Sequence, residues 1–337
     1  MRYHVKILPS GKTFLVKPSQ TILEAAISAG INIPYGCQNG SCGACKAKVI
    51  NGNIAIDNYQ RTVLSDTEKE NGFTLCCKAL ALEDLVVETR ESEVNFEDAP
   101  KISPVRVESL EKLNDSVMKM LLKLPGNEVL KFKAGQYIEF LIEGGARRAF
   151  SIASSPNDSL IELHLRLIEG GKFTHYVFEE MQEKSIHKIE APIGQFYLRK
   201  STKPIIFVTG GTGFAPIKSM IEDIIRNKIK RPIYLYRGAR EFNDLYMHNL
   251  CLDWVNSMDD FTYIPVSEKQ SKECDDLRIG LVHKIVLEDF KDLENTQVYC
   301  CGSPGLVEVA FDDFVKKGLA EEEFFADAFT FAPQKNN

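Results

Sequence analysis

The sequence predicts an α+β multi-domain protein with three parts: an α+β module, an antiparallel β-barrel and an α/β domain with a parallel sheet. Three observations lead to this fold class. At 337 residues the chain is too long for one ordinary core, since domains commonly hold about 100 to 200 residues. Short alternating segments fill residues 105–198, as a small barrel requires. From residue 204 onward, apolar strands alternate with amphipathic helices, which favours a parallel sheet.

The N-terminal module is assigned to residues 1–93. Residues 3–16 alternate around Pro9-Ser10-Gly11 and predict two strands, and residues 21–29 predict a helix with Ser19 or Thr21 as its N-cap. After a cysteine-rich loop, the turn Asn51-Gly52 predicts that residues 47–49 and 53–56 pair as a hairpin. Residues 85–88 predict the strand that closes the module.

A polar, acidic stretch separates this module from the barrel. Residues 91–104 read ESEVNFEDAPKISP, a composition typical of an interdomain connection. We therefore expect a linker at 94–103, the barrel domain at 104–200 with one helix near 174–181, and the α/β domain at 201–337. The α/β domain should contain strands at 205–210, 233–238, 261–265 and 298–301, and helices at 217–226, 246–255 and 306–317.

Composition excludes several classes of protein. A hydrophobic content of 44% with 26% charged residues is typical of a folded globular chain. A formal net charge of −6 and a pI near 5.7 offer no basic field for nucleic acid. The N-terminus lacks the apolar core of a signal peptide, and no apolar run approaches the roughly 18 residues that cross a bilayer. We expect a soluble, cytoplasmic protein that binds neither nucleic acid nor membrane.

Four of the nine cysteines form a pattern that suits metal ligation. Cys37, Cys42 and Cys45 form C-x4-C-x2-C, and the fourth ligand must come from the adjacent pair Cys76 and Cys77. This spacing is that of plant-type 2Fe-2S ferredoxins. Glycines in the loop let the backbone wrap closely and direct N–H groups at the sulfurs. A structural zinc site would require a more symmetrical pair of CxxC knuckles.

Two short motifs in the barrel region suit a flavin nucleotide. In Arg148-Ala149-Phe150-Ser151, an arginine can pair with a phosphate, a ring can stack on an isoalloxazine, and a hydroxyl can donate toward N5. Residues 170–174, Gly-Gly-Lys-Phe-Thr, open a helix whose free N–H groups can hold a pyrophosphate. The alternatives are a surface arginine beside a buried phenylalanine, and a plain helix start.

Two glycine turns follow strands of the α/β domain. Residues 209–216, TGGTGFAP, join an apolar strand to a helix, although they lack the G-x-G-x-x-G spacing and are not a P-loop. Residues 299–305, YCCGSPG, again end a strand with a glycine turn. A nucleotide would lie across these neighbouring strand ends.

Taken in order, these motifs resemble the ferredoxin-NADP reductase superfamily. RAFS is similar to its R-x-Y/F-S/T flavin signature and GGTGFAP to its nucleotide loop. With a ferredoxin domain of β-grasp fold at the N-terminus, the chain resembles the reductase components of bacterial oxygenases, such as phenol hydroxylase reductase. The segments GGTGFAPIKSM, YCCGSPGLV and GLAEEEFFADAF are most similar to the CDP-6-deoxy-Δ3,4-glucoseen reductase branch, which serves 3,6-dideoxysugar synthesis.

The resemblance implies roles for individual residues. Arg148 would bind FAD phosphate, Phe150 would stack on the flavin, and Ser151 would lie near N5, with Cys301 near the hydride-transfer centre; Ser151 and Cys301 are the expected catalytic residues. When the segment around Cys76 and Cys77 is compared without gaps with ferredoxin-like reductases, the fourth cluster ligand is Cys77. The remaining cofactor-binding candidates are Gly171, Lys172, Phe173 and Thr174 for the pyrophosphate, Gly210, Gly211, Thr212, Gly213 and Gly302 for the nicotinamide nucleotide, and Phe329 as the C-terminal aromatic at the flavin.

One residue of the flavin motif departs from the family pattern in a way that bears on the affinity for FAD. Phe150 stands where many relatives have tyrosine, so stacking is kept but a phenolic hydrogen bond to the ribityl chain is lost.

Charged residues after the second strand of the α/β domain bear on the choice between NADH and NADPH. Arg237 and Arg240 follow the second strand, where an adenosine ribose could lie, and would favour a 2'-phosphate unless they are ordinary solvated side chains. The acidic continuation through Glu241 and Asp244 argues against a strong phosphate site, and the resembling reductases mostly use NADH. We favour NADH, with NADPH as the alternative.

The expected activity is a relay of electrons from NADH to FAD, to the 2Fe-2S cluster and to an external protein. The resemblance implies a pyridoxamine-phosphate-dependent dehydrase as that partner. A reductase component of a mono- or dioxygenase is the second hypothesis. The third is a redox-sensing or binding module without catalysis.

Overall fold

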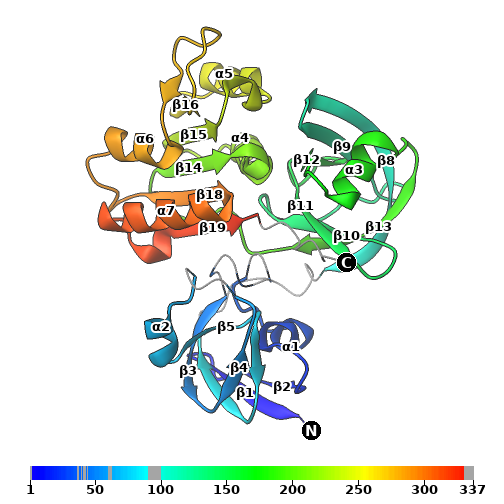
Figure 1. The fold of residues 1–337 in the computed structure, drawn as a ribbon, viewed down its shortest axis with the longest axis vertical. Helices are drawn as coiled ribbons and strands as arrows, with labels where there is room; N and C mark the ends of the chain where they lie inside the picture. The colour runs from blue at the N-terminus through cyan, green and yellow to red at the C-terminus, as the bar shows by residue number, and fades with distance from the viewer. Residues whose placement is uncertain are drawn as a thin grey trace. The chain divides into compact units, whose positions relative to one another are not determined.

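The computed structural model describes residues 2–35, 38, 40, 43, 45–59, 63–89 and 100–329. The chain forms two units, one of residues 1–98 with 326–337 and the other of residues 99–325. Figure 1 shows the elements of each unit. Among the residues described, no helix has the length and apolar character needed to span a membrane.

The N-terminal unit contains a five-stranded mixed sheet. In it the sheet order is β2-β1-β7-β3-β5, with β1 and β7 parallel and their other neighbours antiparallel. Helix α1 packs against β2 and β6, and begins after Thr21, which forms a capping box with Glu24. The β-grasp expectation is confirmed. Its elements are β1 (Tyr3–Leu8), β2 (Thr13–Val16), α1 (Ile22–Ser28), β3 (Lys46–Asn51), β4 (Ile54–Ile56), α2 (Asp66–Glu70), β5 (Phe73–Leu75), β6 (Ala79–Ala81) and β7 (Leu85–Glu88).

One predicted pairing in this unit is wrong. Strand β4 pairs with β6 and not with β3, which pairs with β5 and β7. Between β3 and β4, Gly52 has φ +93°, and a Cβ there would lie 2.4 Å from the carbonyl oxygen of Asp84. The chain therefore crosses close to the turn before β7 instead of folding back as a hairpin.

The middle of the chain forms the antiparallel barrel. The six strands follow the order β11-β10-β13-β8-β9-β12, and a bridge between Ile152 and Leu163 joins the two edges. Strand β8 already begins at Lys101, which pairs with Ala191, so it starts inside the segment expected as a linker. The elements are β8 (Lys101–Asn114), β9 (Val117–Lys123), β10 (Tyr137–Leu141), β11 (Arg147–Ser151), β12 (Ile161–Arg166), α3 (Lys172–Glu179) and β13 (Ile186–Ile193).

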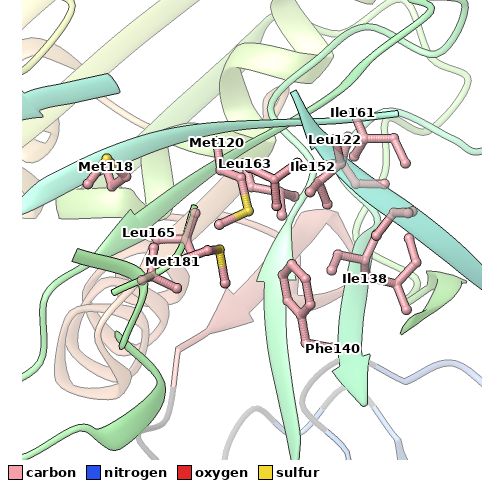
Figure 2. Close-up of a cluster of buried hydrophobic side chains, with 14 of the residues drawn as sticks. Met118, Met120, Leu122, Ile138, Phe140, Ile152, Ile161, Leu163, Leu165 and Met181 are labelled. Atoms are coloured by element: carbon pink, nitrogen blue, oxygen red, sulfur yellow. The ribbon is translucent and has the colours of Figure 1, made fainter. Parts of the chain in front are cut away.

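Apolar side chains from these strands fill the barrel. Figure 2 shows Met120, Leu163 and Phe140 among the buried side chains that point into this core. Helix α3 covers one end with Phe173 and Val177. Burial of apolar surface of this kind supplies most of the free energy that closes such a barrel.

The α/β domain contains a six-stranded sheet of order β17-β16-β15-β14-β18-β19, parallel from β17 through β18. Strand β14 has β15 on one side and β18 on the other, so the strand order reverses beside β14. The elements are β14 (Ile205–Gly210), η2 (Gly211–Gly213), α4 (Phe214–Arg226), β15 (Ile233–Ala239), η3 (Phe242–Asp244), α5 (His248–Ser257), β16 (Phe261–Ser267), β17 (Arg278–Ile279), α6 (Val282–Asp289), β18 (Gln297–Gly302), α7 (Pro304–Lys316), η4 (Glu321–Glu323) and β19 (Phe324–Ala328).

Candidate nucleotide, flavin and iron-sulfur sites

The two glycine turns of the α/β domain meet where the strand order reverses. A Cβ on Gly213 would lie 2.3 Å from the carbonyl oxygen of Cys301, and one on Gly302 would lie 3.3 Å from the backbone nitrogen of Gly210. The turns thus pack backbone against backbone at the carboxyl ends of β14 and β18. In open parallel sheets, nucleotides bind in the crevice at this position.

Polar groups lie in and beside these turns. Thr212 lies in the same turn, between Gly211 and Gly213. Thr209 is 1% exposed, and its hydroxyl has no hydrogen-bond partner within the part of the chain that the structure describes. Arg166, at the end of β12 in the barrel, is exposed and lies against the loop, since a Cβ on Gly211 would be 3.2 Å from its Nη1. Arg166 is not among the candidates predicted from the sequence, because nothing in its alternating strand distinguishes it from other surface cations.

Arg237 on β15 lies beside Thr209 of β14 and is 2% exposed. Its guanidinium stacks on Phe214 at 3.6 Å from the ring centroid, and Nη1 donates to Cys251 Sγ at 3.4 Å. The alternative of a solvated side chain is therefore wrong for Arg237. A guanidinium enclosed in this way offers no exposed face to a 2'-phosphate, whereas Arg240 is exposed.

The flavin motif lies on β11. Arg148 and Phe150 are two residues apart and share one face of the strand. The Phe150 ring is half-buried and packs against Phe140 and Phe173, with centroid distances of 5.9 and 5.7 Å. Ser151 ends the strand and is buried. Phe150 keeps part of its surface accessible, as a ring that stacks on a flavin requires, and a surface arginine beside a buried phenylalanine stays the alternative.

The second flavin motif opens α3. Gly171 is the N-cap and no side chain caps the helix, so the N–H groups of its first turn, which begins with Lys172 and Phe173, remain available for an anion. A Cβ on Gly171 would lie 2.7 Å from Thr174 Oγ1. That hydroxyl donates to the Gly171 carbonyl and accepts from the N–H of Ile168. Thr174 therefore shapes the turn with its side chain, and only its backbone N–H is left for a phosphate.

Buried charges lie between the barrel and helix α4. Glu162 on β12 accepts from His164 Nε2 at 2.8 Å and lies 3.3 Å from Lys218 Nζ. Burial opposes its ionisation, but these two partners hold the pKa of Glu162 down at about 2. Burial also lowers the pKa of His164, despite the opposing effect of Glu162. A neutral His164 donates to Glu162 and accepts from the Tyr246 hydroxyl at 3.0 Å.

Of the cysteine motif, the structure describes Cys45, Cys76 and Cys77. The N–H of Cys77 points at Cys45 Sγ at 3.5 Å, a donor of the kind that stabilises a cluster thiolate. Cys76 is completely buried, its N–H donates to the Cys45 carbonyl, and its own carbonyl accepts from Leu23. Cys37 and Cys42 lie outside the described residues.

The described residues fit all three expected groups. Gly40 and Gly43 have φ values of +85° and +73°, and a Cβ on either would lie about 3 Å from neighbouring side chains, so the loop follows a path that glycine permits. The uncapped start of α3 and the half-exposed ring of Phe150 suit a flavin nucleotide. The packed glycine turns suit a nicotinamide nucleotide. The side chain of Phe329 is half-buried. Its role at the flavin stays a prediction.

Three family models match successive parts of the chain. They are the 2Fe-2S iron-sulfur cluster binding domain at residues 5–82, the oxidoreductase FAD-binding domain at 104–197 and the oxidoreductase NAD-binding domain at 207–312. Their order is the order inferred from the motifs. The exact domain boundaries stay a prediction.

Among the proteins that match almost the whole chain are two curated reductases and one solved structure. The CDP-6-deoxy-L-threo-D-glycero-4-hexulose-3-dehydrase reductase of Yersinia pestis is 35% identical, with 98% of this chain and 99% of the relative covered. The reductase component of phenol 2-monooxygenase from a Pseudomonas species is 31% identical, with 98% and 95% covered. The cytochrome P450 reductase GcoB of Amycolatopsis is 27% identical, with a TM-score of 0.80 and coverage of 98% and 99%.

Both the domain series and these full-length similarities confirm the resemblance inferred from the motifs. The chain belongs to the family of iron-sulfur flavoprotein reductases that join a 2Fe-2S ferredoxin domain to FAD-binding and NAD-binding domains, and it is an oxidoreductase.

Proposed function

We propose that the chain is the reductase that supplies electrons to a CDP-6-deoxyhexulose 3-dehydrase, the pyridoxamine-phosphate-dependent enzyme of 3,6-dideoxysugar synthesis. The observation that carries this proposal is the 35% identity to the Yersinia pestis reductase along the full length of both proteins. The segments around the nucleotide turns and the C-terminal strand, which resemble this branch, lie within that similarity.

We further propose what the chain's own residues do in this activity. The packed turns at Gly213 and Gly302 receive the nucleotide, and Arg166 neutralises phosphate charge beside Gly211. The first N–H groups of α3 bind the FAD pyrophosphate, while Phe150 packs against the ring. Cys45 and Cys77 hold iron together with Cys37 and Cys42. When bound, FAD allows a two-electron hydride donor to serve a one-electron acceptor.

NADH is the nucleotide we propose, on the basis of charge. A cavity of about 220 Å³ lies beyond the carboxyl ends of β15 and β16 and includes Glu241, Lys269 and Glu273 in its lining. Lys269 already contacts Glu241 in an ion pair. A 2'-phosphate placed here would meet two carboxylates and one cation that is already paired, which disfavours NADPH. We therefore expect NADH to bind more tightly than NADPH, although Arg240 is exposed nearby.

A reductase component of a mono- or dioxygenase is the second candidate, favoured by the 31% identity to the phenol 2-monooxygenase component. A cluster bound by four thiolates requires reduced cysteines, which favours a cytoplasmic location for either activity.

Reconstitution distinguishes the two partners. Purified reductase and NADH are combined with a CDP-6-deoxyhexulose 3-dehydrase and its sugar nucleotide, or with the oxygenase component of a phenol hydroxylase and phenol. We expect deoxygenated sugar to form only in the first mixture, in proportion to the NADH consumed. Hydroxylated product in the second mixture, without turnover in the first, would reject the dehydrase as partner.

A further inference from the structure

Two consecutive residues of helix α4, Lys218 and Ser219, donate hydrogen bonds to the barrel. Lys218 Nζ donates to the carbonyl of Ala153 at 3.2 Å, and Ser219 Oγ donates to the carbonyl of Ser154 at 2.6 Å. Lys218 is 5% exposed and Ser219 is completely buried. Two neighbouring side chains thus hold two neighbouring carbonyls, which fixes the helix along its axis as well as against the barrel.

The segment they hold is where the barrel closes. Ile152 bridges Leu163, the N–H of Ala153 donates to the Glu162 carbonyl at 2.7 Å, and Ser154 Oγ accepts from the N–H of Glu162. We call residues 152–154 and 161–163 the closure seam. Lys218 contacts both sides of this seam, since its Nζ also lies 3.3 Å from the Glu162 carboxylate.

Both ends of this connection lead to a cofactor site. The seam follows directly after β11, which carries Arg148 and Phe150. Helix α4 follows directly after the turn Gly211–Gly213. A displacement of α4 along the seam would therefore move the nucleotide turn relative to the flavin strand.

The buried charges make the connection stiff. Lys218 also contacts Glu222 at 2.8 Å, and Glu162 is held in turn by His164. Removing a buried charge partner leaves the others unsatisfied, so the group resists partial separation. At the far end of α4, Arg226 contacts Asp158 at 2.5 Å across the same interface.

We propose that Lys218 and Ser219 are positioning residues that set the register between the nucleotide turn and the flavin-binding strand, and hence the rate of hydride transfer. This proposal rests on the NADH-dependent flavin reduction assigned above. Reacting atoms must be held about 3 to 3.5 Å apart, and a misplacement of about 1 Å can lower the rate about 100-fold. Neither residue is placed at the bound nucleotide, so nucleotide affinity should change little.

The test uses the holoenzyme with Lys218→Met, Lys218→Arg and Ser219→Ala, and with Lys230→Met as the matched control. Lys230 is exposed in the segment after α4. Three quantities are measured: the rate of flavin bleaching by saturating NADH in a stopped-flow instrument, the dissociation constant of NADH, and hydrogen exchange of amides in residues 153–164 and 211–226.

We expect Lys218→Met to slow bleaching about 10- to 100-fold. Its NADH dissociation constant should stay within about twofold of the wild-type value, while amide exchange rises in both segments. Lys218→Arg should recover part of the rate and Ser219→Ala should lose less than Lys218→Met, while Lys230→Met should match wild type.

Unchanged bleaching rates in Lys218→Met and Ser219→Ala would overturn the proposal. A rise in the NADH dissociation constant large enough to account for slower turnover would also overturn it. If Lys218→Met does not fold, Ser219→Ala decides: wild-type bleaching rejects the proposal, and slowed bleaching with raised amide exchange supports it. Failure of wild-type protein to bleach with either nucleotide would instead reject the assigned activity.

Discussion

Gly213 lies directly against the carbonyl of Cys301, so that a single added methyl group would stand 2.3 Å from that oxygen. The backbone at Gly213 is right-handed helical, with φ −58° and ψ −13°, a conformation that any residue adopts. Glycine is required here only because two chain segments meet. The contact joins the nucleotide turn to the end of β18 and thereby defines the crevice.

Gly213→Ala should weaken nucleotide binding without unfolding the protein. The methyl group must push the turn away from β18, and we expect the NADH dissociation constant to rise about tenfold, which corresponds to about 1.4 kcal/mol of lost binding free energy. Titration calorimetry of NADH on the purified protein measures this.

Gly305→Ala is the matched control for that substitution. Gly305 lies in the first turn of α7, and a Cβ there meets nothing within 4 Å. Alanine is favoured over glycine in helices by up to about 1 kcal/mol, so nucleotide binding should be unchanged and thermal stability equal or higher. Equal effects of the two substitutions on NADH affinity would reject the account of the crevice.

Phe150→Tyr should tighten FAD binding. The new hydroxyl would supply a donor to the ribityl chain, and one hydrogen bond contributes about 0.5 to 1.5 kcal/mol, or about 2- to 10-fold in affinity. FAD release during dialysis, followed by flavin fluorescence, measures the change. Phe150→Leu removes the ring and should release FAD faster than wild type. Tighter binding by leucine would contradict a stacking role for this residue.

Cys77→Ala should abolish the 2Fe-2S absorbance, whereas Cys76→Ala should retain it. The N–H of Cys77 points at Cys45 Sγ. The carbonyl of Cys76 instead accepts a hydrogen bond from the N–H of Leu23 in α1. Iron content and visible spectra of the two purified variants provide the comparison. Loss of the cluster only in Cys76→Ala would exchange the two assignments.

Stability should fall as pH decreases below about 6.5, and His164 should account for part of the loss. Burial lowers the pKa of His164, so on acidification the unfolded chain binds a proton at His164 before the folded chain does. The folded state therefore loses up to about 1.4 kcal/mol per pH unit between the unfolded and folded pKa values. His164→Gln should flatten this dependence, measured as thermal midpoints between about pH 5 and pH 7.5.

His175→Gln tests whether the effect belongs to His164. His175 lies exposed on α3, so its replacement should leave the pH dependence as in wild type. A slope that survives in His164→Gln and disappears in His175→Gln would show that the buried network does not control acid stability.

Local patterns predicted the cofactor-bearing elements well. The strand at Ile205–Gly210, the glycine turn and the helix after it combine an apolar run, a flexible turn and a 3.6-residue period. The same holds for Thr21, whose hydroxyl caps α1 as expected. Such features depend on contacts within a few residues, which a single sequence displays.

Features set by distant contacts were missed. Strand β4 takes β6 as its partner because β3 is already paired with β7, and no local pattern reports that competition. Helix α6 begins after Leu281 without a side-chain cap, so its start carries no recognisable signal.

The connection through Lys218 was also invisible in the sequence. The periodicity of α4 assigns Ile217, Met220 and Ile221 to the buried face, and a neighbouring lysine looks like a solvated residue. Lys218 is buried only because the barrel covers a second side of the helix. The burial of Arg237 is invisible in the sequence for the same reason, since aromatic rings from elsewhere in the domain enclose it.

An anaerobic titration of the purified protein with NADH, and then with NADPH, tests the central claim most directly. Flavin bleaching is followed by absorbance and cluster reduction by EPR. We predict that NADH bleaches the flavin, that a rhombic 2Fe-2S signal grows with it, and that NADPH does so less efficiently. If neither nucleotide changes either signal, the chain does not transfer electrons from nicotinamide to the cluster, and a redox-sensing or binding role without catalysis would replace the reductase assignment.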